Sequence, residues 1–193
     1  ATLAILEQIK DREIKVMYIV PDSFFMSETQ KKQHRVVFNV LQEYARSGMI
    51  HSLWLVDNKE ATKIVGEGAL GSYYDNTNSA IANFLANYNW FKNSEPIVGN
   101  LHEPKEISRI RTVSIGEIEK NEEKLYFLLD NTTEMCYYYS ISSDTKENDK
   151  KLLSRIRAHL EDKENTTFGI WENSSSNSFF YSIKFTHYIQ EEK

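Results

Sequence analysis

The chain has 193 residues, enough for one large domain or for one domain and part of another, and its 40% hydrophobic and 12% aromatic content excludes disorder. Its formal net charge of −5 argues against a nucleic-acid groove, and the absence of any run of ~18 apolar residues argues against a membrane span. The single cysteine, Cys136, excludes an intramolecular disulfide and fits a reducing compartment such as the cytoplasm.

Alternating helices and strands are predicted over the first third of the chain. Residues 1–10 and 27–47 have the apolar spacing of helices, whereas residues 14–20 and 50–56 are short, apolar and rich in strand-forming residues. This helix–strand–helix–strand order is typical of a parallel sheet that helices cover on both faces, so we expect an α/β fold.

The predicted helix over residues 27–47 carries its own boundary signals. Ser27 and Gln30 are spaced for a capping box at its start, and Gly48 is placed for a C-cap at its end. The helical period predicts an inward face made of Val36, Val37, Val40, Leu41 and Tyr44.

A long helix over residues 76–90 is predicted next, after a short helical stretch at 61–66 and a loop with Gly66, Gly68 and Gly71. These glycines do not follow a strand in a G-x-G-x-x-G spacing, so they do not predict a phosphate cradle. The apolar stripe of the long helix is Ile81, Phe84, Leu85 and Tyr88.

The pattern changes at a boundary near Gly99, after which a second, smaller unit of mixed sheet is predicted. The Tyr137–Tyr139 run is typical of a strand with one buried and one exposed face. The predicted elements are the end of a helix at 108–111, strands at 111–118 and 135–142, a helix at 149–160, and a hairpin of strands 166–171 and 178–189.

Three side chains are candidates for binding a planar ligand. Asn58 follows the second strand, and Tyr73 and Asn78 stand five residues apart at the polar start of the long helix. Ligands of α/β proteins lie at the carboxyl ends of strands, and asparagine amides offer both the donors and the acceptors that a purine edge requires. The alternative is that Asp57 and Asn58 only form a turn or a helix cap.

Glu103 and Glu106, the acidic pair, are the candidate catalytic residues. Two carboxylates three residues apart at a helix start lie on nearby faces and can orient a water molecule toward a phosphate. The alternative is that they only favour the dipole of a helix that begins near Pro104. The five histidines have no metal-ligand spacing, so no metal site is predicted.

Taken in order, these segments resemble the second half of a tubulin/FtsZ-superfamily GTPase, closest to the TubZ-type tubulins of plasmids and phages. Val16–Pro21 is similar to the strand and sugar-contacting loop that follow the family's phosphate-binding helix, and Leu53–Asn58 resembles the strand whose final asparagine contacts guanine. Tyr73–Phe84 is similar to the start of the family's central helix. Leu101 stands where cell-division members usually carry asparagine, which favours the TubZ-type branch.

The resemblance implies a role for each candidate residue. Asn58, Tyr73 and Asn78 would hold guanine. Glu28 would hydrogen-bond the ribose, with the alternative that it is only an exposed residue at a helix start. The acidic pair would match two acids on a loop that enters the nucleotide pocket of the neighbouring subunit, so that hydrolysis requires polymerisation. The cofactor would be GTP or GDP, with Mg²⁺ as a companion for which the sequence identifies no protein ligand.

On this resemblance the chain is an α/β protein in three parts: the end of a parallel-sheet nucleotide domain (1–75), a central helix with its connection (76–99), and a smaller mixed-sheet C-terminal domain (100–193). The intact protein would assemble head-to-tail into cytoplasmic filaments that segregate plasmid or phage DNA through an adaptor protein, with cell division as the weaker option. The sequence begins within a helix and lacks the family's glycine-rich phosphate loop, so we expect a fragment that does not hydrolyse GTP alone.

Two other interpretations stay open. The chain can be a non-enzymatic α/β module that binds a partner or drives assembly, with the asparagine and glutamate positions acting as helix caps. An unrelated doubly wound enzyme ranks last because the sequence lacks any complete motif for one. A glycine-rich phosphate loop encoded directly upstream would favour the GTPase, and a start codon near Ala1 would favour the module.

Overall fold

The computed structural model describes residues 2–9, 11–66, 73–120 and 122–191. Most of the predicted elements are present, with shifts of a few residues at their ends. The elements in chain order are α1 (Thr2–Gln8), β1 (Lys15–Val20), η1 (Ser23–Phe25), α2 (Glu28–Arg46), β2 (Ser52–Asp57), α3 (Asn58–Val65), α4 (Tyr73–Lys92), β3 (Val98–Asn100), β4 (Ile110–Glu117), β5 (Glu122–Leu125), β6 (Glu134–Ser142), α5 (Ser143–Asn148), α6 (Leu152–Leu160), β7 (Thr166–Asn173) and β8 (Phe179–Thr186).

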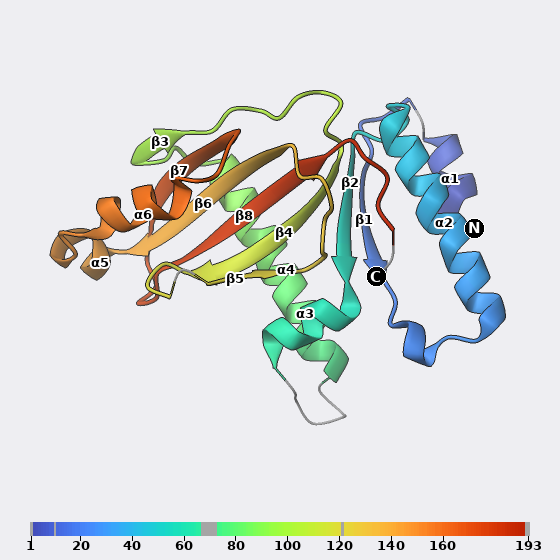
Figure 1. Ribbon diagram of the computed structural model, residues 1–193, viewed down its shortest axis with the longest axis horizontal. Coiled ribbons are helices and arrows are strands. Elements are labelled where there is room, and N and C mark those ends of the chain that lie inside the picture. The colour runs from blue at the N-terminus through green and yellow to red at the C-terminus, as the bar shows by residue number, and fades with distance from the viewer. Residues whose placement is uncertain (1, 10, 67–72, 121, 192–193) are drawn as a thin grey trace.

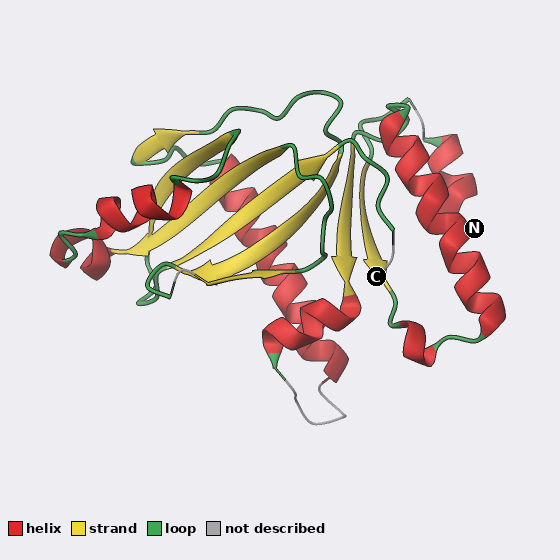
Figure 2. Cartoon of the chain, in the orientation of Figure 1, coloured by secondary structure: helices red, strands yellow, loops and turns green. Residues whose placement is uncertain are grey.

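The strands of the described chain form one eight-stranded sheet in the order β1-β2-β4-β8-β6-β7-β3, with β5 paired to β4 (Figures 1 and 2). Strands β1, β2 and β4 are parallel to one another, whereas β8 runs antiparallel between β4 and β6. The predicted α/β class with parallel and mixed portions is confirmed. The two portions meet where β2 pairs with β4 at Leu53↔Ile110 and Trp54↔Arg111.

Helices cover both faces of the sheet because the strands alternate apolar side chains between the faces. In β2, Trp54 and Val56 belong to the core cluster of α3 and α4, while Leu53 and Leu55 pack in the cluster of α1 and α2. A third cluster packs α6 against β6. Figure 1 shows α4 crossing behind the strands, with α5 and α6 at the end of the sheet far from α1 and α2.

Helix α2 begins and ends as predicted. Ser27 Oγ accepts a hydrogen bond from the N–H of Gln30 at 3.3 Å, and the Gln30 side chain accepts one from the N–H of Ser27 at 2.8 Å. Gly48 follows the helix with a φ of +81°, a conformation that glycine adopts at low cost.

The predicted inward face of α2 is only partly correct. Val36 is 60% exposed, whereas the buried residues are His34, Phe38, Leu41, Gln42 and Ala45. The two polar members are buried because they find partners: His34 Nδ1 lies 2.5 Å from the hydroxyl of Tyr18, and Gln42 exchanges two hydrogen bonds with the backbone of Gln190.

Three predictions about the second half are wrong. Strands β7 and β8 form no hairpin, because β6 lies between them, parallel to β7 and antiparallel to β8. Both faces of β6 are buried, so the Tyr137–Tyr139 run has no exposed face and the strand requires a neighbour on each edge. The segment 103–109 is a loop rather than a helix. The short strands β3 and β5 were not predicted.

Candidate functional site

The carboxyl ends of β1 and β2 lie side by side and lead into a loop and a helix start (Figure 1). Asp57, the last residue of β2, caps α3: its Oδ1 accepts hydrogen bonds from the N–H groups of Lys59 at 2.8 Å and Glu60 at 3.4 Å. Burial raises the pKa of Asp57, and these two bonds oppose that rise. Asp57 therefore has the capping role that the sequence left open as an alternative.

The predicted base-binding residues belong to two helices that pack together at this end of the sheet. Asn58 is the first residue of α3 and is half-buried, and its side-chain amide has no hydrogen-bond partner within the described residues. Thr62 Oγ1 lies 3.4 Å from Thr77 Oγ1, which joins α3 to α4 next to the exposed Asn78. Tyr73 begins α4, but its side chain lies outside the described residues.

A cavity of about 280 Å³ opens beside Asp57, between the end of β1 and α2; we call it the strand-end cavity. Its charged lining consists of Lys31, Arg35 and Lys59 against Asp22 and Asp57, so positive side chains outnumber negative ones. A cavity of this kind at the carboxyl end of parallel strands suits an anionic ligand.

Glu28, the predicted ribose contact, is the exposed first residue of α2. Its carboxylate accepts a hydrogen bond from Lys31 Nζ at 2.9 Å, and this bond lowers the pKa of Glu28. Sequence reasoning missed Lys31 and Arg35, although their spacing of four residues on one helix face was a usable signal.

The acidic pair lies on the loop between β3 and β4. Glu103 is paired with Lys92 at 2.5 Å, and the hydrogen bond from Lys92 lowers the pKa of Glu103. Glu106 is paired with Arg109 at 3.0 Å. The two glutamate side chains are 80% and 90% exposed, so both carboxylates are held by cations and still face solvent.

Glu134, which the sequence did not single out, holds this loop in place. Its carboxylate accepts hydrogen bonds from the N–H of Lys105 at 3.1 Å and from the hydroxyl of Ser108 at 2.8 Å. Glu134 begins β6, far from the loop in the sequence, so no local pattern could have identified this contact.

The base-binding candidates and the acidic pair lie at opposite ends of β2 (Figure 1). Asp57 ends β2 and Asn58 follows it, whereas the loop of the acidic pair meets the amino end of this strand, where the N–H of Leu53 donates to the carbonyl of Arg109 at 2.8 Å. At roughly 3.3 Å per residue, β2 spans about 20 Å. One chain therefore does not bring the two groups of residues together.

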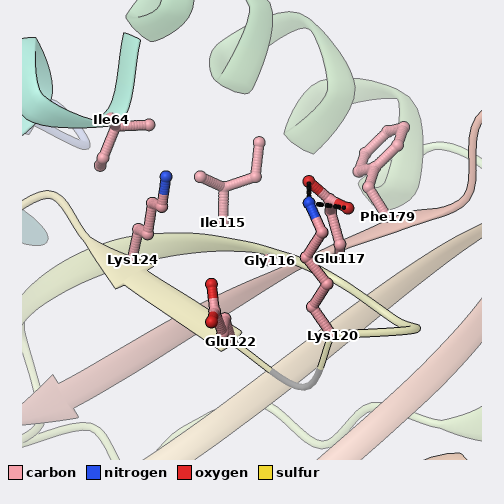
Figure 3. Close-up of a pocket in the computed structure, with 8 residues that line it drawn as sticks. All are labelled: Ile64, Ile115, Gly116, Glu117, Lys120, Glu122, Lys124 and Phe179. Carbon is pink, nitrogen blue, oxygen red and sulfur yellow. Dashed lines mark hydrogen bonds and ion pairs between the residues drawn. The ribbon is translucent and has the colours of Figure 1, made fainter. Parts of the chain in front are cut away.

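A further cavity of about 210 Å³ lies between α3 and the β4–β5 hairpin (Figure 3). Ile64, Ile115 and Phe179 provide its apolar part, and Lys120 forms an ion pair with Glu117 at 2.8 Å on its rim. Among the described residues, none that the sequence predicted for binding or catalysis lines this cavity.

Within the described residues, no group of three or more His, Cys, Asp or Glu side chains is placed to hold a metal ion. Across the same residues, no helix has the length and apolarity needed to cross a bilayer.

Comparisons with known proteins identify the fold. No protein-family model matches the sequence, and no curated protein sequence does. Among solved structures, TubZ of Bacillus thuringiensis serovar israelensis in a GTPγS-form protofilament is similar, with a TM-score of 0.67 and 13% identity over 95% of this chain and 55% of that chain.

Two further structures agree with this similarity. CetZ from Methanosaeta thermophila gives a TM-score of 0.63 at 16% identity over 96% of this chain and 56% of that one. The M. jannaschii FtsZ dimer gives 0.63 at 10% identity, over 94% and 57%. The chain spans little more than half the length of these proteins, and over that part it has the fold of the tubulin/FtsZ group.

Proposed function

We propose that this chain is part of a tubulin-like GTPase whose active site forms between successive subunits of a head-to-tail filament. The observation that carries the proposal is the position of the two candidate groups at opposite ends of β2. When identical subunits stack along this direction, the exposed acidic pair of one copy meets the strand-end cavity of the next. Such a contact is heterologous and does not close, so it generates a filament.

The side chains at each end suit their proposed roles. The side-chain amide of Asn58, which has no partner within the described part of the chain, can donate to and accept from a guanine edge. Tyr73 and Asn78 complete the base contacts, and Glu28 holds the ribose. Lys31 and the other cations of the strand-end cavity favour the phosphates of GTP or GDP. For Mg²⁺, the described residues supply no ligand cluster.

The acidic pair orients the attacking water in this proposal. The hydrogen bond from Lys92 lowers the pKa of Glu103, so this carboxylate is a hydrogen-bond acceptor at neutral pH. Glu106, which is paired with Arg109, offers the second carboxylate. A water molecule held between two such acceptors is aimed at the terminal phosphate of the neighbouring subunit's nucleotide.

The cellular role belongs to the same proposal. The sequence resemblance implies segregation of plasmid or phage DNA in the cytoplasm, and the presence of TubZ filaments among the similar structures supports self-assembly. The net charge of −5 favours an adaptor protein over direct contact with DNA.

Substitution of Glu106 in the full-length protein tests this proposal. Glu106→Ala is expected to leave GTP binding unchanged and to lower turnover by about 10²-fold or more, because water positioning is lost while the nucleotide contacts remain. The measurement is GTPase rate against protein concentration, together with nucleotide affinity. The matched control is Glu147→Ala, an exposed glutamate of α5, which should behave as wild type.

Wild-type turnover should rise steeply above a critical protein concentration. Unchanged turnover in Glu106→Ala would contradict the assigned role. Absence of turnover at every concentration would instead favour the non-enzymatic assembly module, an interpretation that the capping role of Asp57 and the intrachain ion pairs of the acidic pair also fit.

A further inference from the structure

An aromatic side chain protrudes beside the strand-end cavity. Phe24, in the short helix η1 that follows β1, is 84% exposed, the highest value for a large hydrophobic side chain among the described residues. Its backbone N–H donates to the side chain of Asp22 at 2.9 Å, so the turn that carries the ring is held at its start. Aromatic residues are enriched at the buried centres of protein interfaces, which makes Phe24 a candidate anchor.

A cavity of about 490 Å³ opens at the other end of β2; we call it the loop-side cavity. It is lined by residues 103–106 of the β3–β4 loop, by the beginnings of β1 and β2 and by the end of α4. Tyr88 and Pro104, which are both partly exposed, give it apolar surface. Its volume lies within the range of about 300–1,000 Å³ that takes small organic molecules, so one aromatic side chain fits.

The proposed head-to-tail contact brings these two features together. Asp22, Ser23 and Met26, which flank or belong to η1, line the strand-end cavity, whereas the loop of the acidic pair lines the loop-side cavity. Because β1 and β2 are parallel and paired along their length, the two features lie at opposite ends of the same two strands. A contact that places the acidic pair at the strand-end cavity therefore also places η1 of one copy beside the loop-side cavity of the next.

The charges of the two surfaces are complementary. Asp22 is exposed next to η1, and Lys105 is exposed where it lines the loop-side cavity. Neither side chain forms an ion pair within the described part of the chain. The backbone N–H of Lys105 donates to Glu134 at 3.1 Å, which fixes the place from which the lysine reaches out. Opposite charges that face each other across a contact set its register.

We propose that Phe24 of one copy docks in the loop-side cavity of the next copy, with Asp22 and Lys105 forming an ion pair across the contact. This inference rests on the proposed head-to-tail assembly and names the side chains that hold it together. Burial of the ring against Tyr88 and Pro104 removes apolar surface from water on both sides. Because the ring and the cavity lie at opposite ends of one chain, the contact repeats from copy to copy.

Assembly of the full-length protein tests the anchor. A slowly hydrolysed GTP analogue separates assembly from turnover, and sedimentation measures the critical concentration. Phe24→Ala is expected to raise that concentration by at least about tenfold, while its Tm stays within about 2 °C of the wild type because the ring is 84% exposed. Leu153→Ala, which truncates an exposed apolar side chain of α6, is the control and should assemble as the wild type does.

Reversal of the two charges tests the register. Asp22→Lys and Lys105→Asp should each raise the critical concentration by about three- to tenfold, and the double variant should return it to within about threefold of the wild type. Recovery requires the two residues to meet between copies, since they lie at opposite ends of one chain. Lys150→Asp, a reversal at an exposed lysine between α5 and α6, should leave the critical concentration unchanged. If Asp22→Lys fails to fold, Phe24→Ala and Lys105→Asp carry the test.

This contact and the proposed catalysis can fail separately. A wild-type critical concentration in Phe24→Ala, or no recovery in the double variant, would overturn the contact even if the protein hydrolyses GTP. The expected shifts in a protein that assembles without turnover would support the contact and contradict the proposed GTPase. Absence of assembly at every concentration would overturn both.

Discussion

The ion pair between Lys92 and Glu103 sets the ionisation of one member of the acidic pair. The lowered pKa of Glu103 means that the ion pair contributes above the ordinary glutamate pKa and is lost as pH falls through the lowered value. Because the Glu103 side chain is 80% exposed, solvent screens its effect on stability. The main effect of the ion pair is therefore to lower the proton affinity of Glu103, a candidate catalytic carboxylate.

Removal of this lysine should move the pH dependence of the proposed reaction. Lys92→Met raises the pKa of Glu103 toward its ordinary value, so the acid limb of the pH–rate profile of the full-length protein should shift to higher pH. Lys120→Met, which breaks another exposed ion pair, with Glu117, is the control and should leave the limb in place. If the acid limbs of Lys92→Met and the wild type coincide, Lys92 does not set the pKa of a carboxylate that the reaction uses.

Single residues were predictable where their partners are near in the sequence. The capping box of Ser27 and the capping option for Asp57 depend on contacts within three residues and are present. The burial of Gln42 depends on Gln190, 148 residues away, and the anchoring of Lys105 on Glu134, 29 residues away. Such contacts are set by the tertiary fold, and one sequence carries no signal for them.

At the scale of elements, the stability of α2 should depend on its N-terminal cap. Ser27→Ala removes the acceptor for the N–H of Gln30 and should cost about 1 kcal/mol of unfolding free energy, or about 2–4 °C in Tm for a chain of this size. Thermal unfolding followed by circular dichroism measures it. Ser154→Ala, at an exposed position inside α6, should be neutral or slightly stabilising. Equal losses in both variants would show that the cap contributes nothing specific.

The elements themselves were easier to predict than their neighbours in the sheet. Periodicity identified β6, β7 and β8 as strands, because alternation and β-branched content are local properties. Pairing is not local: the segment 173–177 suggested a hairpin, but the doubly buried β6 occupies the place between β7 and β8. Similarly, the turn at residues 106–107 replaces a predicted helix because Glu134 ties Lys105 and Ser108 to β6.

At the scale of the whole molecule, an active site formed between copies should allow two defective subunits to complement each other. Full-length Glu106→Ala keeps the base-binding residues, and Asn58→Ala keeps the acidic pair. In an equal, random mixture, about a quarter of the contacts join an intact pocket to an intact acidic loop. The mixture should therefore recover up to about a quarter of wild-type turnover, as measured by phosphate release.

Each variant alone provides the control for this mixture. If the mixed rate equals the sum of the two separate rates, the acidic pair and the base-binding residues do not act across subunits. Such a result would contradict an active site formed between subunits, while leaving the observed fold unchanged.

The attachment of the β3–β4 loop to β6 has a consequence for assembly. Glu134 already fixes the backbone at Lys105 and the side chain of Ser108 in a single chain. A loop that is ordered before docking loses little conformational entropy when it enters a neighbouring subunit, so more of the contact energy is available for association. The glutamate at the start of β6 thus preorganises the surface through which one copy would recognise the next.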